Sequence, residues 1–146
     1  MMNDNDRAEP DPAIGALDHV ALIVDDLEDE AARYRDVFFA EVSPTEVHAH
    51  YGCSSAFIDL GYSRLRLFQA HDAASPIASF FGPHPLAGIH HVCYRVEEIE
   101  TASRTLKMKG YRPLGTGDYK RSNQGKRMIF LRPPDRPGPL VKLEEQ

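Results

Sequence analysis

The sequence contains only two cysteines, Cys53 and Cys93, among its 146 residues. Two cysteines are too few for the disulfide framework of a small secreted protein, so this composition indicates a reducing compartment. No apolar run approaches the roughly 18 residues of a transmembrane helix, and we expect no signal peptide before the first strand. The sequence therefore predicts a cytoplasmic protein without a membrane partner.

A long stripe of basic residues is also absent, because 17 Lys and Arg are outnumbered by 22 Asp and Glu. The net charge of −5, with His neutral, makes nucleic acid a poor partner. The chain length suits one compact domain with a buried core. We expect that domain to span residues 16–146 and to follow a polar, proline-containing, disordered tail at residues 1–15.

One segment of the sequence occurs twice. Residues 17–27, LDHVALIVDDL, return 72 positions later as residues 89–99, IHHVCYRVEEI, so that His19 corresponds to His91. Both copies pass from an apolar strand through an acidic turn into a helix. An internal duplication indicates two similar halves related by a pseudo-twofold axis, and we expect the two histidines to face one pocket near that axis.

Periodicity and turn signals extend the repeat to the order βαβββ, written twice, which predicts an α+β fold of paired modules. Module one is expected at 16–72, a linker at 73–87 and module two at 88–146. The expected elements are strands 17–24, 40–47, 54–60 and 64–69 with helix 27–39, and strands 89–96, 111–114, 126–131 and 140–145 with helix 98–109.

Helix ends and strand faces can also be predicted. Asp25 and Glu28 resemble an N-terminal capping box, and Gly110 is the expected stop of the second helix. In the last strand of each module, apolar residues alternate with one basic residue, Arg66 or Lys142. If the apolar side chains pack under the helices, both cations lie on the cavity side with the two histidines.

These residues resemble the vicinal oxygen chelate superfamily, which includes glyoxalase I and the extradiol dioxygenases, and within it the methylmalonyl-CoA epimerases most. The matching segments are 17–21, 34–36, 61–67, 75–78, 88–92, 125–126 and 140–144. The resemblance implies a curved, cleft-bearing sheet and an isomerase that transfers a proton alpha to the carbonyl of an acyl-CoA. It also implies a homodimer by analogy.

The resemblance further implies a divalent metal held by four side chains, at the positions of His19, His91, Arg66 and Lys142. Arg has no lone pair to give and Lys gives one only when deprotonated, so we expect no metal cofactor. If cobalt, zinc, manganese or magnesium is bound, His19 and His91 are its expected ligands, with Glu144 as a substitute carboxylate. The candidate catalytic residues are His19, His91, Lys142, Arg66 and Glu144.

Two other functions stay open at this point. One is a divergent, metal-free enzyme acting on another carboxyl-bearing thioester, and the other is a non-catalytic module that binds an anionic metabolite. Strand 54–60, which the resemblance places at the reacting carbon, carries Ser54 and Ser55 in place of an obvious carboxylate, so no opposing base is identified. The remaining histidines in strand ends and loops are expected to be surface residues; these are His48, His50, His71 and His84.

Overall fold

The structure of the chain is a computed structural model that describes residues 15–75, 88–122, 124–135 and 138–146. Nearly all of the predicted tail 1–15 and most of the predicted linker 73–87, including His84, lie outside the described residues. The elements are β1 (Leu17–Ile23), α1 (Leu27–Phe38), β2 (Glu41–Val42), β3 (Glu46–His48), η2 (Ala49–Tyr51), β4 (Cys53–Asp59), β5 (Arg64–Ala70), β6 (Gly88–Val96), α3 (Ile99–Met108), β7 (Arg112–Pro113), β8 (Lys120–Arg121), β9 (Arg127–Arg132) and β10 (Leu140–Glu145).

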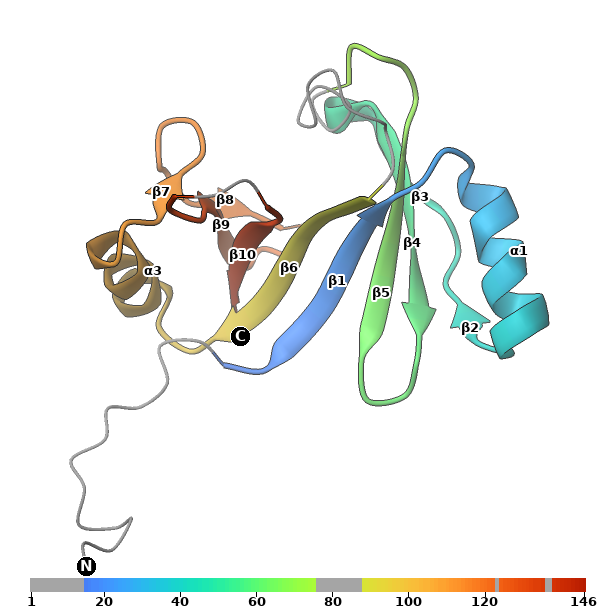
Figure 1. The fold of residues 1–146 in the computed structure, drawn as a ribbon, viewed down its shortest axis with the longest axis horizontal. Helices are drawn as coiled ribbons and strands as arrows, with labels where there is room; N and C mark the ends of the chain where they lie inside the picture. The colour runs from blue at the N-terminus through green and yellow to red at the C-terminus, as the bar shows by residue number, and fades with distance from the viewer. Residues whose placement is uncertain (1–14, 76–87, 123, 136–137) are drawn as a thin grey trace, which may run out of the picture.

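One mixed sheet runs through the molecule in the order β2-β4-β5-β1-β6-β10-β9-β7, with β3 paired to β4 and β8 paired to β9 (Figure 1). β1 is parallel to β5, β6 is parallel to β10, and the two central strands β1 and β6 are antiparallel. The order is symmetric about the centre of the sheet, because β2, β4, β5 and β1 of module one correspond to β7, β9, β10 and β6 of module two. The predicted α+β fold of paired βαβββ modules is confirmed.

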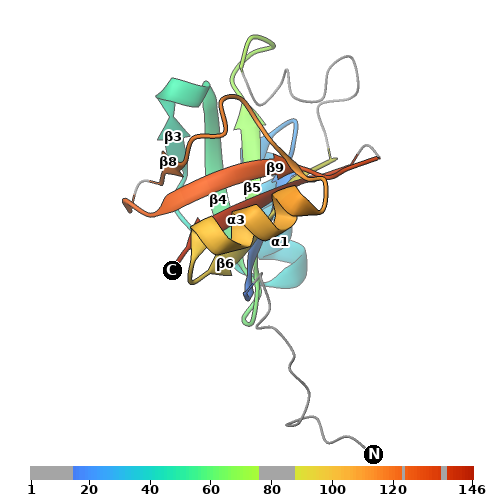
Figure 2. The same ribbon diagram turned by 90° about the vertical axis from the view of Figure 1, so that its left-hand side faces the viewer.

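Each module packs its helix against its own strands, and Figure 1 and Figure 2 show α1 and α3 at opposite ends of the sheet. The core of module one contains Leu27, Ala56, Ile58 and Leu67, all buried. The core of module two contains Val96, Ile99, Ala102, Leu106, Ile129, Leu131 and Leu143. Because Leu65 and Leu67 of β5, and Val141 and Leu143 of β10, pack into these cores, the opposite faces of both strands are left for the cavity.

The helix ends follow from local residues, with one correction. The N-cap of α1 is Asp26, whose side chain accepts a hydrogen bond from the backbone N–H of Asp29, so the predicted capping box at Asp25 is wrong by one residue. α3 ends at Met108, and Gly110 has a φ of 99°, which confirms its predicted place at the helix stop.

The predicted strand 40–47 is broken into β2 and β3. Pro44 lies between the two strands and has no N–H to donate to the ladder, so pairing with β4 is interrupted there. The two-residue strand β8 was not predicted, because Lys120–Arg121 offers too short a pattern to read.

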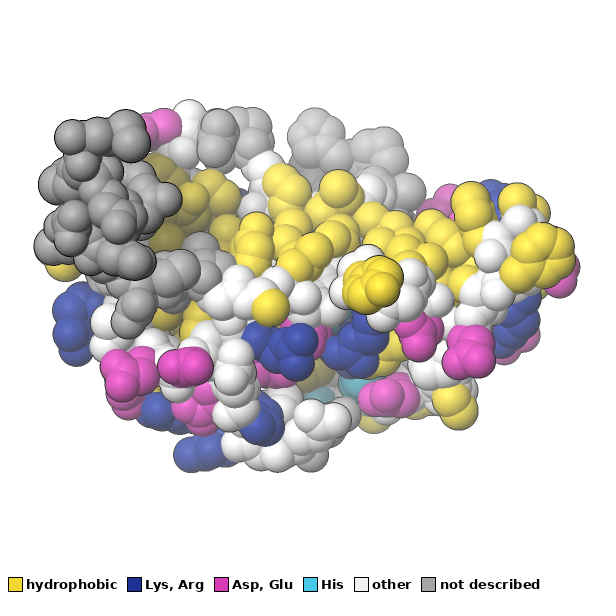
Figure 3. Space-filling model, turned by 90° about the horizontal axis from the view of Figure 1, so that it is seen from below, with side chains coloured by type: hydrophobic (Ala, Val, Ile, Leu, Met, Phe, Trp, Pro, Cys, Tyr) yellow, Lys and Arg dark blue, Asp and Glu magenta, His cyan; other side chains and the backbone are white. Residues whose placement is uncertain are grey.

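The outer surface carries several large hydrophobic side chains, and Figure 3 shows hydrophobic groups gathered in a band across one face. The most exposed are Tyr62, Phe39 and Met108. Within the described ranges, no helix is long and apolar enough to cross a membrane.

Candidate active site

Four neighbouring strands, β5, β1, β6 and β10, supply polar side chains to a single cavity of about 400 Å³. Among these side chains are Arg66, His19, His91 and Lys142, in that order across the sheet. Backbone register brings them together, because Ala21 on β1 lies opposite both Arg66 and His91, and Cys93 on β6 lies opposite both His19 and Lys142. The predicted placement of two histidines and two cations on one cavity wall is therefore what the structure shows.

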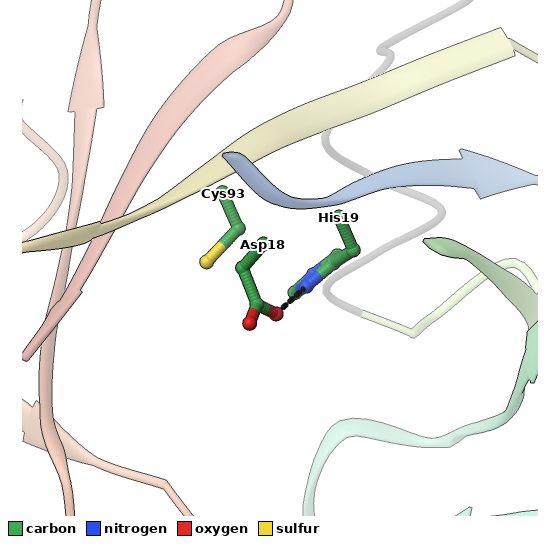
Figure 4. Close-up of side chains that lie close together, drawn as sticks. All are labelled: Asp18, His19 and Cys93. Carbon is green, nitrogen blue, oxygen red and sulfur yellow. Dashed lines mark hydrogen bonds and ion pairs between the residues drawn. The ribbon is translucent and has the colours of Figure 1, made fainter. Parts of the chain in front are cut away.

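The two histidines meet at the centre of the sheet. His19 Nε2 lies 3.3 Å from His91 Nε2, and the two residues are only 2% and 3% exposed. Asp18 holds His19 from behind, with its Oδ2 2.6 Å from His19 Nδ1, as Figure 4 shows. Arg64 and Arg95 form ion pairs with the same carboxylate at 2.8 and 3.4 Å.

The hydrogen bonds fix where the protons lie. The Asp18 carboxylate only accepts, so His19 donates its Nδ1–H and carries a lone pair on Nε2. That lone pair accepts the Nε2–H of His91, whose Nδ1 in turn accepts the Nδ1–H of His90 at 2.7 Å. The three rings thus form one directed chain of neutral imidazoles that begins at Asp18.

The surroundings of the three imidazole rings keep them uncharged. Burial lowers the pKa of His19 to about 4 against the opposing effect of Asp18, and Lys142 lowers it further. Burial and Lys142 lower the pKa of His90 to about 4, and burial with the neighbouring His90 lowers that of His91 well below its ordinary value. Burial would raise the pKa of Asp18, but hydrogen bonds from His19 and Arg64 outweigh it and lower the value.

Arg66 lies between two aromatic rings. Its guanidinium carbon is 4.9 Å from the centroid of Phe57 and 4.7 Å from that of Phe68. The Nε atom is buried and has no hydrogen-bond partner among the described residues. A planar cation held in this way offers a fixed fork of donors, which suits a carboxylate.

Lys142 is 4% exposed and lines the same cavity from β10. Its Nζ lies 3.5 Å from Glu144 Oε1, so Glu144 shares the cavity side of the strand as predicted. The ammonium is also 5.7 Å from the centroid of the Phe130 ring. A buried ammonium with one carboxylate partner keeps donors available for a ligand.

His48 is a cavity residue that sequence reasoning missed. It was expected on the surface, but it is half-buried at the end of β3 and lines the cavity. Its Nε2 lies 2.7 Å from Ser55 Oγ and 3.3 Å from a terminal nitrogen of Arg66. The available signal was the alternation of β3 itself, in which Glu46 and His48 share a face, but the strand is three residues long. His50 and His71 are exposed as predicted.

The rest of the cavity combines an apolar wall with a basic rim. Figure 3 shows Lys and Arg side chains, interspersed with Asp and Glu, beside the visible histidines. The apolar lining residues are Phe57, Phe68, Leu114, Met128, Phe130 and Leu140. The cationic ones, besides Arg66 and Lys142, are Arg64, Lys120 and Arg121. Such a cavity fits a partly apolar anion.

The histidine pair has the right bite for a metal ion, but the remaining donors do not fit one. Two nitrogens bound to one ion at about 2.0–2.1 Å stand about 3.0–3.4 Å apart, which includes the observed His19–His91 separation. However, the positions on the flanking strands hold the cations Arg66 and Lys142. Two positive charges beside the pair oppose a divalent cation.

A second group also lies within reach of one ion. Asp18, His19 and Cys93 place ligand atoms within 4.8 Å of one another (Figure 4). The Asp18 carboxylate is already engaged by His19, Arg64 and Arg95. Burial raises the pKa of the Cys93 thiol to about 12, so the thiol stays protonated and is a poor ligand. This donor set does not fit a metal either.

Comparison with known proteins places this geometry in a family. The family model of the Glyoxalase/Bleomycin resistance protein/Dioxygenase superfamily matches residues 18–130. The ethylmalonyl-CoA/methylmalonyl-CoA epimerase of Cereibacter sphaeroides is 43% identical over 132 residues, which is 90% of this chain and 98% of that protein. The mitochondrial methylmalonyl-CoA epimerase of Homo sapiens is 39% identical over 90% of this chain and 74% of its own length.

Solved structures agree with the sequence relatives. The methylmalonyl-CoA epimerase of Mycobacterium tuberculosis superposes with a TM-score of 0.75 at 26% identity, over 91% of this chain and 89% of that one. A variant of the Streptomyces coelicolor methylmalonyl-CoA epimerase in complex with 2-nitronate-propionyl-CoA gives 0.75 at 25% identity, over 91% and 98%. The chain therefore belongs to the Glyoxalase/Bleomycin resistance protein/Dioxygenase superfamily, as the repeated histidine segment predicted.

Proposed function

We propose that the chain is an acyl-CoA epimerase that moves a proton alpha to a thioester carbonyl without a metal ion. The observation that carries this proposal is the pair Arg66 and Lys142, which occupies one cavity with two neutral histidines. The relatives named above as epimerases of methylmalonyl-CoA and ethylmalonyl-CoA support an acyl thioester that bears a second carboxylate.

In the proposed reaction each cation has its own task. Arg66 binds the free carboxylate of the substrate, and its buried, unpartnered Nε within the described part of the chain supports this role. Lys142 lies beside the enolate that forms when the alpha proton leaves, stabilises its negative charge and can return a proton to carbon. Glu144 holds the ammonium from the side. His19 and His91 line the bottom of the cavity and contact the thioester group.

Deuterium exchange tests the proposal directly. Methylmalonyl-CoA or ethylmalonyl-CoA incubated with the protein in D₂O is expected to gain deuterium at the alpha carbon, as measured by mass spectrometry or NMR. If exchange is absent while CoA esters still bind, the chain is a binding module or acts on another carboxyl-bearing thioester. If no acyl thioester binds, the acyl-CoA assignment is wrong.

Removing either cation should weaken ligand binding. A charge-assisted hydrogen bond contributes about 1.5–3 kcal/mol, so Arg66→Met or Lys142→Met is expected to lower affinity by about ten- to a hundredfold. The free energy of unfolding should change little or rise, because a buried cation costs desolvation energy in the free protein. Calorimetric titration with the CoA ester and urea unfolding measure the two effects. The exposed Arg33→Met is the matched control, and unchanged binding in both Met variants of the cavity would contradict the assignment.

Three further predictions belong to the same proposal. We propose that residues 16–146 form one domain of two modules, at 16–72 and 88–146, joined by 73–87. A cytoplasmic location is supported by the free, buried thiols of Cys53 and Cys93. We also propose that the chain forms a homodimer. Light scattering after size-exclusion chromatography measures the mass of the assembly.

A further inference from the structure

His48 differs from the other imidazoles of the cavity. His19, His90 and His91 are at most 8% exposed and hydrogen-bond to one another along the central strands. His48 stands apart on β3, is half-buried and lines the cavity from the wall that β3, β4 and β5 form. Lys142 lines the same cavity from β10, at the other side of the two central strands (Figure 1).

The contacts of His48 fix its tautomer. An arginine guanidinium can only donate, so the 3.3 Å contact with Arg66 requires a lone pair on His48 Nε2. The proton of the neutral ring therefore lies on Nδ1. The Ser55 hydroxyl can donate to the same lone pair at 2.7 Å and can accept from Arg66 at 3.4 Å. Since a hydroxyl hydrogen rotates freely, Ser55 can release the lone pair without moving its oxygen.

The surroundings keep this lone pair free of a proton at neutral pH. Burial and the nearby Arg66 lower the pKa of His48, Glu46 on the same strand opposes them, and Lys142 lowers it further. Within the described part of the chain, two of the three carboxylates of the cavity already bind cationic or imidazole partners, because Asp18 binds His19 and two arginines and Glu144 lies against Lys142. Glu46, the third of these carboxylates, is exposed and is the competitor that the experiment has to test.

We propose that His48 is the proton acceptor on the β3–β4 side of the substrate, an inference that rests on the proposed epimerase function. The alpha C–H bond breaks, its electron pair passes into the enolate, and an N–H bond forms at His48 Nε2. The Lys142 ammonium then gives a proton to the opposite face of the same carbon, where a new C–H bond forms. The electron pair of the broken N–H bond stays on the nitrogen, which leaves Lys142 as a neutral amine. Exchange with solvent returns His48 to neutral and Lys142 to charged.

An exchange experiment on each epimer separately tests this role. With the full chain in D₂O, His48→Gln is expected to lower alpha-deuterium incorporation at least about a hundredfold for one epimer of methylmalonyl-CoA, the one whose proton faces His48. Exchange of the other epimer starts from the reverse protonation state, in which the Lys142 amine removes the proton that faces it; this step does not use His48 and should persist. Gln can still contact Ser55 and Arg66, so affinity for the CoA ester should be similar to that of the parent in calorimetric titration. His50→Gln, at an exposed position outside the cavity, is the matched control.

The possible results distinguish a failure of the proposed role of His48 from a failure of the proposed epimerase function. If the parent exchanges both epimers and His48→Gln does so at the same rates, His48 is not the acceptor. Equal loss for both epimers with intact binding also contradicts the inference, because a one-sided base affects one face. A one-sided loss in Glu46→Gln with none in His48→Gln would give the role to Glu46. A parent that exchanges neither epimer overturns the proposed function, and the inference with it.

Discussion

Arg66→Glu combined with Lys142→Glu is expected to turn the cavity into a metal site. The double change replaces two cations by two carboxylates on the strands that flank His19 and His91. Two unit charges about 4 Å apart interact by about 4 kcal/mol at an effective dielectric constant of 20, and a divalent ion carries two such charges. A gain in affinity for Co²⁺ or Zn²⁺ of at least about a thousandfold is therefore expected. Metal analysis after dialysis and titration with Co²⁺ measure it.

The matched control is Arg66→Met with Lys142→Met, which removes the same cations and adds no ligand. It should gain far less affinity than the double Glu variant, because two imidazoles alone make a weak site. Adding His91→Ala to the double Glu variant should abolish the gain. A double Glu variant with no more metal than the parent would show that the cation positions do not converge on the histidine pair. A parent that retains one equivalent of metal would contradict the assignment of Arg66 and Lys142.

Acid should destabilise the folded chain well above the pH at which carboxylates titrate. The folded state lowers the pKa of His19 and of His90 from 6.5 to about 4, so the unfolded chain binds more protons below pH 6.5. Stability from these neutral rings is fully present above about pH 6.5, is lost as the pH falls, and levels off near pH 4. By pH 5 the loss is about 2 kcal/mol for each ring. Urea unfolding at pH 7.5, 6.5, 5.5 and 5 measures it.

Variants can assign this pH dependence to the histidine chain. His90→Gln should reduce the slope of unfolding free energy against pH between 6.5 and 5, whatever it does to stability at pH 7.5. His50→Gln, in the exposed η2 turn, should leave the slope unchanged. A parent whose unfolding free energy is flat over this range would mean that the buried rings do not stay neutral.

Much of the fold was predictable because the internal repeat determines the order of its main strands and helices. The apolar alternation of β1 and β6 and the helix stripes recur at fixed spacing, so two equivalent modules and their central strands followed directly. The interruption at Pro44 and the pairing of the short strands β3 and β8 were not predictable. Strands of two or three residues contain too little pattern, and their place is set by tertiary pairing with β4 and β9.

The candidate site was predicted only where strand alternation was readable. Arg66 and Lys142 alternate with core residues in long strands, so their side of the sheet followed from sequence. His48 ends a three-residue strand and reaches Ser55 across the sheet, which no local pattern encodes. Asp18 was also missed as the anchor of His19, because an aspartate in a strand next to a histidine gives no sign of the two arginines that neutralise it.

The pairing of β1 with β6 has a consequence for folding. His19 and His91 are 72 residues apart in the chain, so their contact forms only after a long loop has closed. Contacts of such large sequence separation form late and slow the folding of a domain. Either module can pack its own core earlier, but neither module alone forms the complete cavity. A ligand of this cavity would therefore bind the completed fold alone, and would oppose unfolding of the whole chain at once.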